Sequence, residues 1–331
     1  MQVSLWLYPV TLLLPWLASL GLTALVLREL GRRQVLDRPN ARSSHKAPTP
    51  RGGGWGLLPP LWAAWALVAW QTGDLERAGP VLAASLPLAL ISWADDVRTV
   101  DALPRLLAQA LAVAAGLAAL PADALVFQGL LPLPADRLLA GLGWLWFVNL
   151  YNFMDGIDGI TGGQTVCIGA GLALVLIVAG VDGPLAAYGL ALAGAALGFL
   201  AWNWRPAKVF PGDVGSVTLG YLAGWMLLAA AADGLWLPAL ILPLYYMVDA
   251  TLTLLRRLLR GERIWVAHRQ HFYQRAVDRG IGHDRVVVAM LAANTVLLAL
   301  ALATLWTPWA APAAALPVLA LMGWMRGGGR V

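Results

Sequence analysis

The sequence predicts an all-α membrane protein that crosses the bilayer about eleven times, and two observations support this. Hydrophobic residues make up 60% of the 331 residues and charged residues only 12%, which is not the balance of an ordinary soluble domain. The apolar residues also form stretches close to the roughly 20 residues that a transmembrane helix needs. The predicted spans are 4–27, 55–71, 80–94, 104–121, 138–153, 164–181, 184–202, 215–232, 235–255, 286–306 and 309–325.

Basic residues give an independent check on this count. With eleven spans, all of the 23 Lys and Arg residues except Arg77 and Arg137 fall on one face of the membrane. Short cytoplasmic loops hold an excess of Lys and Arg, so the N-terminus is predicted to be periplasmic and the C-terminus cytoplasmic. This orientation also accounts for the isoelectric point near 9.7, and no nucleic-acid partner is expected. The single cysteine, Cys167, excludes an intramolecular disulfide.

The whole chain, 1–331, is predicted to form one membrane domain whose chemistry lies in its cytoplasmic loops. Polar and glycine-rich clusters recur in these loops and place the predicted active site at the cytoplasmic membrane face. The loops are 28–54, 95–104, 154–163, 203–214 and 256–285.

The first of these loops combines Arg51 with Gly52, Gly53 and Gly54 directly before a predicted helix. Exposed backbone N–H groups at a positively polarised helix start favour a phosphate. Lys46, earlier in the loop, supplies a further donor. The alternative is a disordered, solvated connector.

The second loop begins with adjacent carboxylates, Asp95 and Asp96, which point in different directions on a helix. One could face a metal ion while the other faces a substrate, and their mutual repulsion would favour a bound cation. The alternative is an acidic turn that is paired with Arg98 or Arg105.

The third loop is the most informative stretch, with the sequence NLYNFMDGIDGITGG at 149–163. Asp155 and Asp158 lie three residues apart, as do Asn149 and Asn152, so acids and amides share a helical face. The glycines would let a ligand or a second backbone approach closely. The alternative is a polar cap before the next span.

The fourth loop reads WNWRPAKVFPGDVGS at 202–216. Asp213 lies near a predicted helix start, where it could simply act as a cap. Phe210 offers an aromatic face on which a base could stack, and Asn203 offers amide hydrogen bonds, so a nucleotide site is also indicated.

The fifth loop holds His268 and His271 among arginines that include Arg269. Histidines three residues apart can bind a metal, but among arginines they suit oxyanions better. Asp249, late in the ninth predicted span, is a functional candidate because ionisable groups at membrane depth are costly. Arg256 and Arg257 are its alternative salt-bridge partners.

Taken together, these motifs resemble those of the polyprenyl-phosphate N-acetylhexosamine-1-phosphate transferases, membrane enzymes that start lipid-linked glycan assembly. The last motif is similar to the branch that initiates O-antigen or related surface polysaccharides, and it lacks the triple-histidine run typical of the relatives that build the peptidoglycan precursor. Ser92 and Pro211 replace a glycine and a methionine that are common in relatives. The matching stretches are 43–54, 95–104, 149–163, 202–216 and 267–275.

The resemblance implies a role for each matching residue. Asp213 would be the principal Mg²⁺ ligand, and Asp95 and Asp96 would help to bind the metal or the lipid phosphate. Phe210 would stack on uracil. The nucleotide would be held by Asn152, Asp155, Asp158 and Asn203, with Lys46 and Arg51 nearby. The diphosphate or sugar would be contacted by His268, Arg269 and His271.

The resemblance also implies the reaction and its partners. Undecaprenyl phosphate would attack a UDP-N-acetylhexosamine in the bacterial inner membrane and release UMP, with Mg²⁺, or alternatively Mn²⁺, as cofactor. Direct attack and a covalent phosphoryl-enzyme remain open, and a homodimer is suggested by analogy alone. Alternatives are a peptidoglycan or teichoic-acid transferase of the same family, a lipid or solute transporter, and an inactive scaffold.

Overall fold

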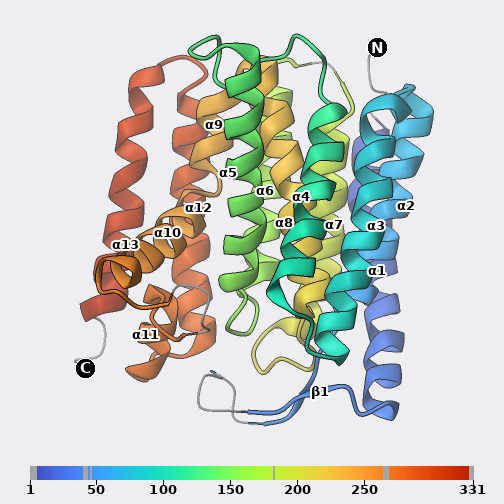
Figure 1. The fold of residues 1–331 in the computed structure, drawn as a ribbon, viewed down its shortest axis with the longest axis vertical. Helices are drawn as coiled ribbons and strands as arrows, with labels where there is room; N and C mark the ends of the chain where they lie inside the picture. Colours follow the sequence, from blue (N-terminus) through green and yellow to red (C-terminus); the bar gives the residue numbers. More distant parts are fainter. Residues whose placement is uncertain (1–5, 40–43, 45–46, 182, 264–267, 328–331) are drawn as a thin grey trace.

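The computed structural model describes residues 6–39, 44, 47–181, 183–263 and 268–327, which form a bundle of long helices (Figure 1). A short antiparallel pair, β1 (Leu36–Asp37) and β2 (Thr49–Pro50), lies at one end of the bundle. The α-helices are α1 (Leu7–Arg32), α2 (Gly54–Thr72), α3 (Leu75–Val97), α4 (Ala102–Ala118), α5 (Leu133–Phe153), α6 (Ile160–Val178), α7 (Leu185–Asn203), α8 (Gly212–Ala230), α9 (Trp236–Ile241), α10 (Leu244–Leu259), α11 (Phe272–Asp278), α12 (His283–Ala303) and α13 (Ala315–Gly327).

The prediction of a helical polytopic membrane protein is confirmed, because seven helical stretches in the described residues are long and apolar enough to span a bilayer. Every predicted span contains a helix, but the count of eleven crossings and the orientation of the termini stay predictions. The ninth predicted span, 235–255, is not one helix. It is divided between α9 and α10 at Pro243, where proline ends regular helical hydrogen bonding, and α10 then runs at a steep angle to the bundle (Figure 1).

Helix α8 lies at the centre of the bundle (Figure 1). Every one of its residues except Leu228 is buried, which is the pattern of a helix that is apolar on all sides. Asp213 stands in its first turn. The position of this carboxylate is therefore fixed by the best-buried helix of the fold.

Glycines allow the first and seventh helices to pack with their backbones in contact. A methyl group added at Gly194 in α7 would overlap the carbonyl oxygen of Leu12 in α1, and one added at Gly198 would overlap that of Trp16. Lipid offers little hydrophobic drive for association between helices, so such close van der Waals packing is a main source of their affinity.

One end of the bundle gathers the loops that carry the predicted chemistry. Helices α3, α5 and α7 finish there, and α2, α6 and α8 begin there, beside the β1–β2 pair (Figure 1). The β1–β2 pair gives the described part of loop 28–54 regular structure. This part of the loop is therefore not the disordered connector that was the alternative prediction. Segments distant in sequence thus meet at one end of the bundle.

We expect Gly194→Ala to destabilise the protein by about 1–3 kcal/mol, since the added methyl group must push α1 away from α7. Gly21→Ala in α1 is the matched control, because nothing lies within 4 Å of its added methyl group and alanine is the better helix former. Thermal unfolding in detergent measures both. Equal melting temperatures for the two variants would contradict this account of the packing.

Candidate active site at the start of α8

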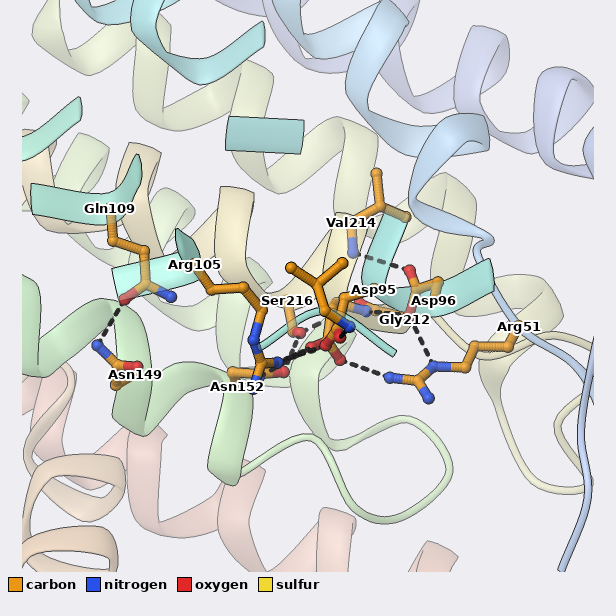
Figure 2. A network of polar contacts seen from close by, with 12 residues as sticks. Arg51, Asp95, Asp96, Arg105, Gln109, Asn149, Asn152, Gly212, Val214 and Ser216 are labelled. Atoms are coloured by element: carbon orange, nitrogen blue, oxygen red, sulfur yellow. Dashed lines mark hydrogen bonds and ion pairs between the residues drawn. The ribbon is translucent and has the colours of Figure 1, made fainter. Parts of the chain in front are cut away.

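Five charged side chains from four segments form an ion-pair cluster at the start of α8, and Figure 2 shows its surroundings. Arg105 Nη1 contacts both Asp95 and Asp213, and its distance to Asp213 Oδ2 is 3.3 Å. Arg51 Nε lies 2.7 Å from Asp96 Oδ1, and Arg51 Nη2 lies 2.6 Å from Asp213 Oδ1. The predicted convergence of the two distant acidic motifs is therefore present in the structure.

Asp96 caps the N-terminus of α8 from a different helix. Its Oδ1 accepts the N–H of Asp213 at 2.8 Å, and its Oδ2 accepts the N–H of Val214 at 3.0 Å. The side chain has no exposed surface. Gly212 precedes this cap with φ of 70°, where a Cβ would approach the Asp96 carboxylate, so glycine is required there. The sequence left open whether Asp213 caps this helix, and in the structure Asp96 supplies the cap.

The glycines that follow Arg51 do not present free N–H groups, so the basis for the predicted phosphate cradle was wrong. The N–H groups of Gly52 and Gly53 donate to the carbonyl oxygen of Phe210 at 3.2 and 2.8 Å, and that of Gly54 donates to Pro211 at 2.9 Å. The N–H of Phe210 in turn donates to Pro50 at 2.8 Å. These bonds join the first and fourth loops backbone to backbone.

Two residues of the third loop region approach the cluster. Asn152 Nδ2 lies 3.4 Å from Asp213 Oδ2, and its Oδ1 accepts the hydroxyl of Ser216 at 2.6 Å (Figure 2). Burial raises the pKa of Asp155 to about 7, and the negative charge of Asp213 adds to this rise. Asp155 is therefore electrostatically coupled to the ion-pair cluster.

The donor set of the cluster fits a Mg²⁺ ion that arrives with a phosphate ligand. Among the described residues no group of three His, Cys, Asp or Glu side chains is arranged to hold a metal by itself. Mg²⁺ needs only one or two carboxylates when phosphate oxygens and waters complete its shell. Asp95 and Asp213 meet at a single cationic atom, Arg105 Nη1, so a cation already lies between them. Three carboxyl groups also face two guanidinium groups, so one negative charge is left over when all three are ionised.

Asp158 and Asn203 belong to a second network that ties neighbouring loops together. Asp158 Oδ1 lies 3.2 Å from His283 Nδ1, and its Oδ2 accepts the N–H of Ala207 at 3.2 Å. Asn203 accepts the N–H of Gly159 and donates to the carbonyl of Val209. Desolvation would raise the pKa of Asp158, but the hydrogen bond and charge of His283 outweigh it and hold the pKa below its usual value.

A third network fixes the histidine loop. His271 Nδ1 lies 3.2 Å from Asp249 Oδ1, and that oxygen also accepts the N–H of Phe272 at 3.1 Å. Asp249 is therefore contacted by His271, and neither Arg256 nor Arg257 forms an ion pair with it in the described structure. Tyr273 donates to the carbonyl oxygen of Phe153 at 3.1 Å and lies against Gly156. The fifth loop is thereby packed onto the third.

The remaining predicted site residues have the following surroundings. His268 stacks on His271 with ring centroids 4.8 Å apart, and desolvation, together with the charges of His271 and Arg257, lowers its pKa to about 4, so it is neutral near pH 7. Arg269 pairs with Asp278. Phe210 is partly exposed, beside Arg51. Lys46 lies outside the described residues.

Sequence reasoning missed two members of the site. Arg105 was considered only as an ordinary partner of an acidic turn, although it bridges two motifs, and Ser216 was not singled out, although it orients Asn152. Arg105 had one weak indication in the sequence, since it is the second basic residue after the Asp pair and follows Arg98. Ser216 carried none beyond its place next to a glycine in a polar turn.

Comparison with known proteins identifies relatives of this chain. The family described as Glycosyl transferase family 4 matches residues 79–231. A probable undecaprenyl-phosphate N-acetylglucosaminyl 1-phosphate transferase of Bacillus subtilis is 26% identical, over 83% of this chain and 78% of its own. A decaprenyl-phosphate N-acetylglucosaminephosphotransferase of Mycobacterium leprae is 28% identical, over 82% and 79%.

A third relative bears another name within the same group of enzymes. The phospho-N-acetylmuramoyl-pentapeptide-transferase of Symbiobacterium thermophilum is 33% identical, over 62% of this chain and 71% of its own. On the fold, the ion-pair cluster and these matches, the chain belongs to the polyprenyl-phosphate hexosamine-1-phosphate transferase family.

Proposed function

We propose that this protein transfers an N-acetylhexosamine 1-phosphate from a UDP-sugar to undecaprenyl phosphate, releases UMP and so initiates a lipid-linked surface polysaccharide such as O-antigen. The observation that carries the proposal is the meeting of Asp95 and Asp213 at Arg105, at one end of a membrane bundle and beside Phe210. The inner membrane of a bacterium is the proposed location.

Two observations support this donor over a UDP-N-acetylmuramoyl-pentapeptide. The relatives from Bacillus subtilis and Mycobacterium leprae, named for N-acetylglucosamine, match more than four fifths of this chain, whereas the Symbiobacterium enzyme matches 62%. The segment 268–275 also lacks the triple-histidine run of muramoyl-pentapeptide transferases. A peptidoglycan role remains the second candidate, supported by the higher identity of the Symbiobacterium relative.

We assign metal contact to Asp213 and Asp95, and we assign Asp96 to positioning. Both Asp96 oxygens accept N–H groups of α8, so it holds the helix start on which Asp213 is mounted. Bound Mg²⁺ would offset the repulsion between the diphosphate and the attacking lipid phosphate. Arg51 and Arg105, partly exposed at the same point, would add positive charge once a phosphate reaches them.

The nucleotide would lie over the joined first and fourth loops. Phe210 would stack on uracil, because its backbone is fixed by Pro50, Gly52 and Gly53 and the residue is only partly buried. Asn152 would contact the nucleotide from the side of Asp213. His268, being neutral, would act as a hydrogen-bonding group and not as a cation.

The lipid chain has an apolar cavity available to it. The cavity has a volume of about 430 Å³ and lies between α5, α8 and α9, where Phe147, Trp144 and Leu228 are among its lining residues. Helix α5 continues from Phe147 to Asn152 in the ion-pair cluster region. A polyprenyl chain along this cavity would thus bring its phosphate towards Asp213.

In the proposed reaction, an oxygen of the lipid phosphate attacks the sugar-bearing phosphorus. The bond from this phosphorus to the bridging oxygen breaks, and UMP leaves with that oxygen. A phosphate dianion needs no deprotonation at neutral pH, so direct attack requires only that Arg51, Arg105 and the carboxylates orient both anions in line.

We expect Asp213→Asn to lower Mg²⁺-dependent UMP release by about 100-fold or more, because several kcal/mol of transition-state stabilisation are lost with the metal ligand. The measurement is UMP formation from UDP-N-acetylglucosamine and undecaprenyl phosphate by purified protein across a Mg²⁺ titration. Asp123→Asn, at an exposed position in the loop between α4 and α5, is the matched control and should keep full activity. Unchanged activity of the Asp213 variant would remove this residue from its role.

Donor specificity can be measured with radiolabelled UDP-sugars offered singly. We expect chloroform-soluble label from one or more of UDP-GlcNAc, UDP-GalNAc, UDP-QuiNAc and UDP-FucNAc, since the segment 268–275 differs from that of the muramoyl enzymes. Label from UDP-N-acetylmuramoyl-pentapeptide alone would establish the second candidate. No lipid-linked label from any donor, by a folded protein, would exclude both.

Asp158 is proposed to act structurally and not on the nucleotide. We expect Asp158→Asn to cost about 1–3 kcal/mol of stability at pH 7.5, through the lost charge-assisted bond to His283. Because the pKa of Asp158 is lowered in the folded protein, this difference is fully present above about pH 4 and disappears as the pH falls below it. Melting temperatures of both proteins from pH 7.5 down to about pH 2 measure this. A raised KM for the UDP-sugar with unchanged stability would instead show nucleotide contact.

A further inference from the structure

A pocket lined by four arginines lies among α10, α11 and α13. Its volume is about 250 Å³, and its lining residues are Thr253, Arg256, Arg260, Gln270, Arg275 and Arg326. No carboxylate of the described chain pairs with any of the four guanidinium groups, although Arg257 and Arg269, which are next to Arg256 and Gln270 in the chain, do have such partners. The pocket is therefore strongly positive.

Acidic groups near the pocket are already engaged elsewhere. Glu262 lies 3.4 Å from Arg257 and accepts the amide of Gln270 at 3.0 Å. Asp249 contacts the ring of His271 and accepts the backbone N–H of Phe272. The other three pocket arginines meanwhile repel Arg256. An anion from outside the chain would offset this repulsion between like charges.

Two of the arginines are held in place before any ligand arrives. The buried ring of Phe272 lies 5.1 Å from the Arg256 guanidinium carbon and 4.8 Å from that of Arg326. Such cation–π contacts fix the guanidinium groups against an aromatic face. Arg279 also bonds the carbonyl oxygens of Met325 and Arg326, which ties the end of α13 to α11.

The pocket adjoins an apolar surface. Leu255, Leu258 and Leu259 of α10 are 48%, 57% and 79% exposed, on a face of the helix next to that of Arg256 and Arg260. Trp324 of α13 is also exposed. Leucines on one face of a helix with arginines beside them are typical of a helix at a membrane interface, where tryptophan is enriched too.

We propose that this pocket binds the phosphate group of an anionic bilayer phospholipid, whose acyl chains lie along the exposed leucines of α10. Guanidinium groups match phosphate oxygens in pairs, and the adjoining leucines favour a lipid over a free anion. Polyprenyl phosphate carries the same chemical group, so the experiment must separate the two lipids. The proposal does not depend on the proposed reaction, because none of the pocket residues contacts the ion-pair cluster.

Native mass spectrometry of the detergent-solubilised protein tests it with dioleoyl-phosphatidylglycerol and dioleoyl-phosphatidylcholine. We expect the wild type to bind phosphatidylglycerol about tenfold more tightly than phosphatidylcholine, and Arg260→Gln with Arg275→Gln to lose that preference. Both arginines are exposed and lie outside the Phe272 contacts, so the fold should persist. Arg28→Gln with Arg32→Gln, two exposed arginines of α1 without an ion pair in the described structure, removes the same charge and should keep the preference.

Three results would overturn the proposal. Equal loss in the two double variants would show only general attraction between a basic surface and anionic lipid. Displacement of phosphatidylglycerol by a lower concentration of undecaprenyl phosphate, weakened in the pocket variant, would assign the pocket to the lipid substrate. Displacement by millimolar inorganic phosphate would assign it to a soluble anion. Equal melting temperatures of the variants and wild type verify that folding is intact.

Discussion

The bond between Asp96 and the start of α8 is the interaction on which the site depends. It joins the end of one helix to the beginning of the most buried one, and Arg51 fastens the same carboxylate to the first loop. A fully buried carboxylate is tolerable only because two N–H groups and a guanidinium compensate its charge. The direction in which Asp213 points follows from this arrangement, so chemistry and folding share one set of contacts.

Two kinds of contact stabilise different parts of the molecule. Along the bundle, glycines bring helices together where lipid supplies little hydrophobic drive. At the loop end, hydrogen bonds and ion pairs join segments far apart in sequence, such as Arg51 and Asp213 at a separation of 162 residues. The polar geometry there is held by side chains at the ends of closely packed helices.

The sequence allowed the helical membrane fold and the meeting of the acidic loops to be predicted, since hydrophobic length and charge segregation are local and additive signals. It did not allow the hydrogen-bond and ion-pair partners of individual residues to be predicted. Nothing near Gly52 indicates that the carbonyl of Phe210 will use its N–H, and nothing near Asp249 indicates His271 in place of Arg256. The break between α9 and α10 did have a signal in Pro243, which a uniformly apolar composition masked.

The backbone contacts around Phe210 have a consequence for ligand binding. Since Pro50, Gly52 and Gly53 hold this residue on both sides, the chain has lost its conformational freedom there during folding. A base that stacks on the ring would meet a surface already in shape, with little ordering left to oppose association. Discrimination among nucleotides would then depend on how well the base fits against the ring. Little of the binding free energy would be spent on ordering the backbone around Phe210.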